Sequence, residues 1–331
     1  MKKYQKGFAV AVLSLFAMTA AFAEGQKDGK SYPNKDIKLV INAGAGGGTD
    51  TILRKMASLI EKNDKVTLFA VNKPASAEAA GPFEVMNAPA DGYTIGNLTY
   101  GSVVGAVWTK LIPQYDLAKL NIFCVITQEA DALMVKADSP YKTYEDFIAA
   151  AKANPGKIKV GISANGGRPS MITTQTEELY GVKFNQIQYV EGAPQQREAL
   201  LSGEADGVIT SLGDFNAVLS SGLVRGLVEY SVLQNDAYPT VPTIKDKGYP
   251  DLATGSFIAM VAPKATPQSV IDTLEKMFSD AQHSKEFRDW TITVGVTPGW
   301  YGQKETAAFI KGMQDKAFKT LDDMKAKGLL K

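Results

Sequence analysis

The segment Ile37-Lys-Leu-Val-Ile-Asn-Ala-Gly-Ala-Gly-Gly-Gly-Thr-Asp50 decides how this chain folds. Its first five residues are a short, mostly β-branched run that is typical of a buried strand. The residues that follow place apolar side chains at helical spacing, which predicts a helix over 51–62 with one buried face (Ile52, Leu53, Met56, Leu59, Ile60). A glycine-rich loop directly between a strand and a helix is typical of α/β proteins that bind ligands at the carboxyl ends of their strands.

The same alternation continues along the chain. Thr143 and Asp146 have the spacing of a capping box, and Thr266-Pro267 predicts another helix start. The pattern predicts a doubly wound α/β architecture in two blocks with a cleft between them. We expect strands at 66–71, 93–98, 132–136, 158–162, 187–190, 207–210, 224–230 and 257–261, and helices at 79–86, 143–153, 170–180, 195–202, 266–281 and 304–325.

The composition excludes several classes of protein. The 331 residues include 36 Lys plus Arg and 35 Asp plus Glu, and 45% are apolar. The formal net charge of +1 provides no basic field for nucleic acid, and the apolar content argues against a disordered chain. A single cysteine, Cys124, and a single histidine, His283, exclude a disulfide framework and a Cys/His zinc site. We therefore expect no metal, no cofactor and no enzymatic activity.

The first residues have the features of an export signal. Lys2, Lys3 and Lys6 precede an apolar run over 8–18, and Ala21-Phe-Ala23 has the small residues of a cleavage site. A membrane anchor is the alternative, but the apolar run is short for a span of roughly 20 residues. We expect cleavage after Ala23, release into the periplasm, and a buried, inert Cys124.

Two loops have the features of an anion-binding site. The first is the glycine cluster at 42–50, and the second is Ser163-Ala-Asn-Gly-Gly-Arg-Pro169, again between a strand and a helix. Glycines let backbone N–H groups converge on a ligand, and a helix start adds the positive end of its dipole. The first loop lacks the lysine of a phosphate-binding Walker loop, and Thr49 breaks the dinucleotide fingerprint. For Asp50 and Thr49, helix capping remains an alternative role.

Several motifs together resemble one family. Gly46-Gly-Gly-Thr-Asp50 and Ala88-Pro-Ala-Asp-Gly-Tyr-Thr94 are similar to motifs of the substrate-binding receptors of tripartite tricarboxylate transporters, the Bug family. Asn154-Pro-Gly-Lys157, Ala199–Asp206 and Thr240–Ile244 resemble later segments of the same receptors. The resemblance extends from about Tyr32 to the C-terminus.

The resemblance implies a two-lobed periplasmic binding protein that is hinged by crossover strands. Residues 1–23 would be the signal peptide, residues 24–125 plus 240–331 lobe 1, and residues 126–239 lobe 2. The implied function is that a monomer captures a small organic acid by lobe closure and delivers it to membrane permease subunits, without nucleic acid. The organic acid would be a di- or tricarboxylate, an amino acid or an aromatic acid. The implied ligand-binding residues are Ala43, Gly44, Gly46, Gly47, Gly48, Thr49, Asp50, Thr99, Gly101, Ser102, Ser163, Asn165, Gly166, Gly167, Arg168 and Ser211.

Two departures from the family pattern bear on the ligand. Where relatives carry glycines, this chain has Ala75-Ser-Ala-Glu78, and Glu78 is a candidate partner for an ammonium group on the ligand or a charge that complements a helix start. Arg168 is a candidate bidentate partner for a ligand carboxylate or a solvated surface residue. Two other functions stay open: a ligand-sensing partner of a signalling receptor and, more remotely, an exported hydrolase, although no Gly-x-Ser-x-Gly motif occurs.

Overall fold

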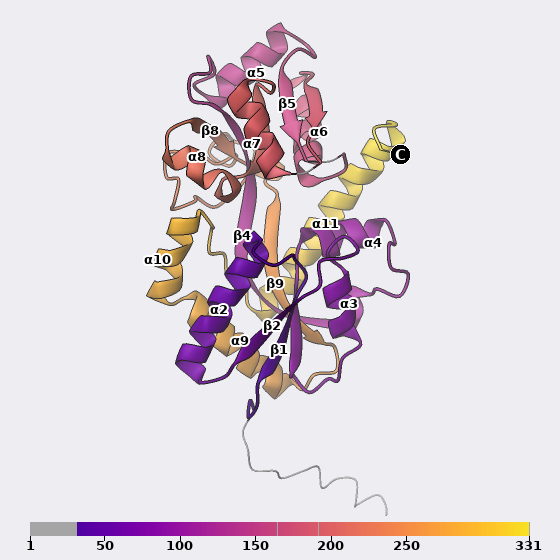
Figure 1. Cartoon of the computed structure of the whole chain (residues 1–331). Coiled ribbons are helices and arrows are strands. Elements are labelled where there is room, and N and C mark those ends of the chain that lie inside the picture. The colour runs from indigo at the N-terminus through magenta and orange to yellow at the C-terminus, as the bar shows by residue number, and fades with distance from the viewer. Residues whose placement is uncertain (1–31, 164, 191, 331) are drawn as a thin grey trace, which may run out of the picture. The chain divides into compact units, whose positions relative to one another are not determined.

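The predicted alternation of strands and helices is present in the computed structural model, which describes residues 32–163, 165–190 and 192–330. The predicted signal peptide lies outside the described residues. The described residues from Lys35 onward form a single compact unit. Its strands belong to two sheets that share one long strand (Figure 1).

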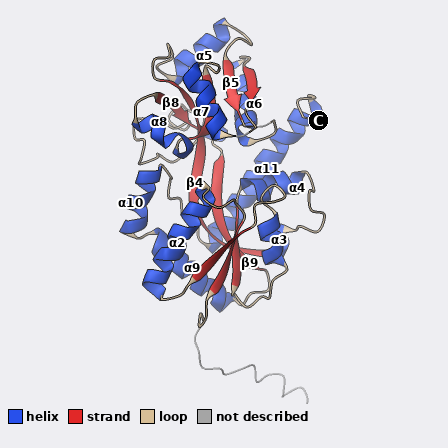
Figure 2. Ribbon diagram, viewed as in Figure 1, coloured by secondary structure: helices blue, strands red, loops and turns tan. Residues whose placement is uncertain are grey.

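The first sheet forms the core of what we call lobe 1. Its parallel strands lie in the order β2-β1-β3, and β9 pairs antiparallel with β3. Because the chain winds in opposite directions from β1 to β2 and from β2 to β3, α2 and α3 cover opposite faces of the sheet (Figure 2). The elements are β1 (Ile37–Ile41), α2 (Gly48–Asp64), β2 (Leu68–Asn72), α3 (Ala80–Met86), β3 (Thr94–Leu98), β9 (Gly255–Pro263), α9 (Gln268–Gln282) and α10 (Lys285–Val294).

The second sheet forms the core of lobe 2. Strand β5 pairs in parallel with β6 and β7, and β7 and β8 pair antiparallel with β4. Thr143 and Asp146 form the predicted capping box at the start of α5. The elements are α5 (Tyr144–Ala153), β5 (Lys159–Ile162), α6 (Arg168–Tyr180), β6 (Asn185–Gln188), α7 (Ala193–Ser202), β7 (Gly207–Ser211), α8 (Asn216–Ser220) and β8 (Val224–Glu229).

Strand β4 (Leu120–Lys136) connects the lobes as one continuous 17-residue strand. Its first part, up to Ala130, pairs with β9, and its last part, from Asp131, pairs with β7 and β8. The apolar run around Cys124 and the strand predicted at 132–136 are therefore two ends of one element. The β4–β9 register shifts at two places, between Ile122 and Cys124 and between Val125 and Thr127, and such bulges bend a strand.

The chain returns to lobe 1 later than the expected boundary at residues 239 and 240. Ile244 and Leu252 pack in the lobe 2 core beside Tyr144, and the backbone N–H of Thr254 donates to the carbonyl oxygen of Tyr230 (2.9 Å). Because these apolar side chains are buried among lobe 2 residues, the structure places the segment up to Thr254 in lobe 2 and the return crossing at β9.

Helix α11 (Gln303–Ala326) contacts both lobes. Ile310 and Leu321 belong to the lobe 1 core, whereas the side chain of Gln175 in α6 donates to the Thr320 hydroxyl (2.9 Å). Between β3 and β4, a π-helical turn (Gly101–Gly105) continues into α4 (Ala106–Trp108). Short 3-10 turns lie at Leu117–Lys119, Gly213–Phe215 and Pro250–Leu252. Within the described residues, no helix has the length and apolar character needed to cross a membrane.

Candidate ligand-binding cleft

A cavity of about 910 Å³ lies between the two lobes, and residues of both lobes line it. Lobe 1 contributes the π-helical turn at Gly101–Gly105, helix α4 and the C-terminal end of α11 with the residues after it, and lobe 2 contributes the starts of α6 and α7. A cavity of this volume is in the range that binds small molecules. Its lining includes Glu78, Gly101, Trp108, Asp131, Ser163, Asn165, Gly166, Gly167, Arg168, Gly192, Ala193, Thr210, Asp214, Leu329 and Leu330.

The predicted second loop lies on this cavity. Ser163, Asn165, Gly166 and Gly167 all line it, and Gly166 has φ +75°, a conformation that glycine adopts at little cost. Gly167 is the N-cap of α6 and makes no side-chain cap, so no side chain caps the backbone N–H groups of Arg168 and Ser170, while Pro169 between them has no N–H. The start of α7, at Gly192 and Ala193, lines the same cavity. Two positive helix ends of lobe 2 therefore face the cleft.

Arg168 is held by a carboxylate of the protein itself. Its Nε donates to Asp131 Oδ2 (2.8 Å) and its Nη2 donates to Asp131 Oδ1 (3.2 Å). The guanidinium also lies over the Tyr100 ring, 5.3 Å from the centroid, and 22% of the Arg168 side chain is exposed. Burial disfavours the charged guanidinium, but Asp131 outweighs this and raises the pKa of Arg168. Arg168 is thus neither a solvated surface residue nor an unpaired cation; its Nη1 group makes no hydrogen bond to a described residue.

The predicted first loop does not line this cavity. Asp50 is only 3% exposed and turns back onto its own loop, where it accepts hydrogen bonds from Gly46 N (2.8 Å), Arg54 Nε (2.9 Å) and Asn72 Nδ2 (2.8 Å). Burial would raise the pKa of Asp50, but these hydrogen bonds lower it. The structure places Asp50 as the residue that fixes the loop. The other predicted residues of this loop do not line the cavity either: Ala43, Gly44, Gly46, Gly47, Gly48 and Thr49.

Three predicted hydroxyl residues lie next to the cavity instead of on it. The Ser102 hydroxyl donates to the Thr99 carbonyl oxygen (2.9 Å), and Thr99 is buried, so both shape the wall behind Gly101. The Ser211 hydroxyl accepts the backbone N–H of Asp214 (3.2 Å). Thr210 lines the cavity in its place, because neighbouring residues of a strand point to opposite sides.

Glu78 lies on the lobe 1 wall of the cavity in an unusual backbone segment. Ser76, Ala77 and Glu78 have φ of +60°, +49° and +65°. The Glu78 carboxylate accepts a hydrogen bond from the Thr99 hydroxyl and lies against Gly101, where an added Cβ would come within 2.5 Å of Glu78 Oε2. The chain therefore keeps the left-handed backbone of a glycine-rich segment while presenting a carboxylate to the cleft.

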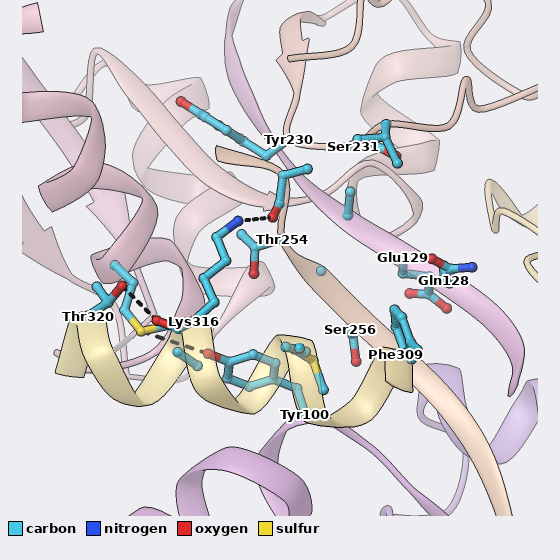
Figure 3. A pocket seen from close by; sticks show the side chains of 18 of the residues that line it. Tyr100, Gln128, Glu129, Tyr230, Ser231, Thr254, Ser256, Phe309, Lys316 and Thr320 are labelled. Atoms are coloured by element: carbon cyan, nitrogen blue, oxygen red, sulfur yellow. Dashed lines mark hydrogen bonds between the residues drawn. The ribbon is translucent and has the colours of Figure 1, made fainter. Parts of the chain in front are cut away.

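A second cavity, of about 330 Å³, lies between the crossover strands, α6 and α11 (Figure 3). Lys316 and Glu129 lie on opposite sides of it, with Thr254 and Ser256 between them. Lys316 Nζ donates to the Ala253 carbonyl oxygen (2.7 Å). Burial lowers the pKa of Lys316 and raises the pKa of Glu129 to about 7. Tyr100 and Ser256 line both cavities and separate them.

The sequence could not indicate several residues of the cleft. Trp108, Leu329 and Leu330 form an apolar part of its wall, and Asp131 supplies the partner of Arg168. No motif marks these residues, because Trp108 and Asp131 belong to ordinary helical and strand patterns and Leu329 and Leu330 follow the end of α11. No group of acidic, histidine or cysteine side chains suited to a metal ion occurs among the described residues.

The chain is similar to known proteins along most of its length. The model of the tripartite tricarboxylate transporter family receptor matches residues 52–325. An uncharacterised protein encoded 5′ of gbd in Cupriavidus necator is 30% identical over 308 residues, covering 91% of this chain and 89% of that protein. The protein BugT of Bordetella pertussis is 26% identical over 304 residues, covering 91% of this chain and 92% of BugT.

Solved structures show the same fold. A TctC solute-binding protein from Polaromonas superposes with a TM-score of 0.77 at 25% identity, covering 88% of this chain and all (100%) of that chain. A protein of R. palustris, solved with adipate, has a TM-score of 0.71 at 22% identity and covers 88% of this chain and 98% of its own. The predicted two-lobed α/β fold class is confirmed.

Proposed function

The chain belongs to the tripartite tricarboxylate transporter receptor family, and on that premise we propose that it captures a small carboxylate between its lobes and delivers it to membrane permease subunits. The resemblance to Bug receptors that the motifs indicated is confirmed, and the chain is a solute receptor and not an enzyme. A relative with this fold was solved with adipate bound, which supports a carboxylate as the class of ligand.

The observation that carries the proposal is the cavity between the lobes. The starts of α6 and α7 point into it from lobe 2, with the Arg168 guanidinium beside them. Backbone N–H groups at helix starts bind carboxylates directly, and their dipoles add a favourable field. A carboxylate seated there meets lobe 1 through Gly101 and Trp108.

Closure follows from the way the chain crosses between the lobes. Strands β4 and β9 run side by side through the junction, and the register shifts near Cys124 and Thr127 give β4 places to bend. A ligand that contacts both lobes favours the closed arrangement by its additional contacts there. The predicted export signal places this capture in the periplasm, and permease subunits then receive the closed form.

A thermal-shift screen tests the proposal. The purified mature chain would be heated with adipate, malate, citrate, glutamate or benzoate, and with glucose and potassium chloride as controls. A bound carboxylate at about 100 times its Kd stabilises the folded chain by roughly 2.7 kcal/mol, which raises the melting temperature by several degrees. Small-angle scattering with the same ligand should show a smaller radius of gyration. If only the sugar or the salt raised the melting temperature, the chain would not be a carboxylate receptor.

A further inference from the structure

The charged side chains on the wall of the cleft do not balance. Among the described residues that line it, the carboxylates are Glu78, Asp131 and Asp214, and the only cation is Arg168. Arg168 and Asp131 neutralise each other through two hydrogen bonds. The described lining then holds two further carboxylates, Glu78 and Asp214, and no further cation.

Each of these two carboxylates accepts a threonine hydroxyl, and Asp214 also has a cation close by, because Arg197 Nη1 donates to its backbone carbonyl oxygen (3.2 Å). The Glu78 carboxylate accepts the Thr99 hydroxyl, and the Asp214 carboxylate accepts the Thr210 hydroxyl (3.1 Å). Neither forms an ion pair with a described residue. A carboxylate in a partly closed cavity is stabilised by a cation within a few ångströms and destabilised by another anion.

The two sides of the cleft carry different charged groups. Lobe 2 contributes the starts of α6 and α7, the Arg168–Asp131 pair and Asp214, whereas Glu78, which lies against Gly101, is the only charged side chain that lobe 1 contributes among the described lining residues. The position on lobe 1 where a ligand could place a second carboxylate is already next to the carboxylate of Glu78. A dicarboxylate that spans the lobes would bring two anions together there.

We propose that the ligand is a zwitterion whose carboxylate faces the starts of α6 and α7 and whose ammonium group faces Glu78. This inference rests on the proposed function, because it concerns the ligand of the same cleft. The ammonium group of the zwitterion would supply Glu78 with the cation that the described lining of the cleft does not provide.

Matched ligands test the proposal by calorimetry. Adipate, δ-aminovalerate and hexanoate have the same methylene chain next to the carboxylate. They differ only in the group at the far end of that chain, which is an anion, a cation or a methyl group, respectively. Norleucine adds an ammonium group next to the carboxylate of hexanoate. One of the two zwitterions should bind at least about tenfold more tightly than adipate and hexanoate, which corresponds to about 1.4 kcal/mol.

Variants at Glu78 test whether this residue is responsible for the preference for a zwitterion. Glu78→Gln keeps the shape and removes the charge, so zwitterion affinity should fall by about tenfold and adipate affinity should rise. Glu78→Gly removes the same charge at φ +65°, a conformation that suits glycine, and provides a folded variant if the glutamine variant is unstable. Glu61→Gln is the matched control, because Glu61 also accepts a threonine hydroxyl (Thr67, 3.2 Å) but lies outside the cavity.

The outcomes separate this inference from the proposed function. A zwitterion preference that both Glu78 variants abolish and Glu61→Gln keeps supports the proposal. If wild type binds adipate as tightly as both zwitterions, or if the Glu78 variants keep the wild-type preference, the inference is overturned while carboxylate capture stands. If none of a broad set of carboxylates binds, the proposed function is overturned together with the inference.

Discussion

At the scale of single residues, the pair of Arg168 and Asp131 joins the second loop to the crossover strand. Asp131 is the first residue of β4 that pairs with lobe 2, and its side chain is almost fully buried. A buried carboxylate without its partner would be costly, so the pair fixes Arg168 at the start of α6. If the start of α6 binds the ligand as proposed, this pair also keeps its N–H groups in place.

A double-mutant cycle should measure this coupling. Arg168→Lys removes the planar fork, and Asp131→Asn removes the charge that the fork binds. We expect each substitution to lower the free energy of unfolding by about 1–3 kcal/mol, and the double variant to cost less than the sum by at least about 1 kcal/mol. Urea unfolding of the four proteins gives these values; additive effects would show that the pair contributes no coupling.

Two glutamates should make stability depend on pH. Burial, reinforced by Asp214 and Asp131, raises the pKa of Glu129 from 4.5 to about 7, and burial also raises the pKa of Glu229 to about 7. At a pH between the unfolded pKa of 4.5 and the folded pKa of about 7, the folded chain binds more protons than the unfolded chain. The free energy of unfolding therefore falls as pH rises through this range. Glu129→Gln and Glu229→Gln should flatten this fall.

Urea midpoints of wild type and the two variants between about pH 5 and about pH 8 check the prediction. The stability gained by each variant over wild type should be on the order of 1–3 kcal/mol larger at the high end of this range than at the low end. A constant difference across the range would contradict it.

At the scale of elements, the left-handed turn at 76–78 shows how the chain replaces glycine. Three successive residues, Ser76, Ala77 and Glu78, have positive φ without being glycine. Each such residue costs roughly 1–2 kcal/mol because its Cβ crowds the following carbonyl oxygen. The turn places Glu78 beside Thr99 and Gly101, so the strain is local to the wall of the cleft.

Replacing Ala77 by glycine should therefore stabilise the chain. Glycine adopts positive φ freely, but it also increases the conformational entropy of the unfolded chain, which offsets part of the gain. We expect the free energy of unfolding to rise by about 0.5–1 kcal/mol. Ala307→Gly is the control, since Ala307 is an exposed position of α11 and the same substitution there should cost about 1 kcal/mol. Opposite signs in urea unfolding support the argument; a loss at both positions would contradict it.

The elements were largely predictable from sequence, because apolar periodicity and caps act locally. The 143–153 helix begins at its predicted cap, and β1 has its predicted bounds. The continuity of β4 was not predictable, since polar Gln128 and Glu129 interrupt its apolar run. The helix over 285–294 was also missed, because its exposed polar residues obscure the apolar pattern around buried Phe287.

Of the two glycine-rich loops that the sequence indicates, only the second lines the cavity. The second loop lies on the cavity because its glycines and Pro169 precede a helix, as the sequence indicates. The first loop has an equally strong glycine pattern but is not among the lining residues, and Asp50 bonds instead to Arg54 and to Asn72 of the next strand, a contact that the sequence pattern does not indicate. Ligand contacts by the predicted residues remain a prediction.

At the scale of the whole described unit, the two lobes share strands and should unfold together. All three tryptophans, Trp108, Trp290 and Trp300, belong to lobe 1. Their fluorescence therefore reports on lobe 1, whereas far-ultraviolet circular dichroism reports on both lobes. Because β4 is part of both sheets, loss of one sheet leaves the other incomplete.

A substitution in lobe 2 tests this coupling. Leu200 is fully buried in lobe 2, and Leu200→Ala should cost about 2–5 kcal/mol. If the lobes unfold as one unit, the tryptophan fluorescence midpoint in urea falls as much as the circular dichroism midpoint. An unchanged fluorescence midpoint would show that lobe 1 unfolds independently.

The burial of Cys124 makes the chain suitable for site-specific labelling. It is the only cysteine, no part of its side chain is exposed, and burial raises the pKa of its thiol, so little reactive thiolate forms. Maleimide dyes should therefore react with introduced cysteines and spare the native one. Cysteines at the exposed positions Glu61 in α2 and Lys152 in α5 would place one fluorophore on each lobe. Energy transfer between them would follow opening and closing in single molecules of an otherwise unaltered protein.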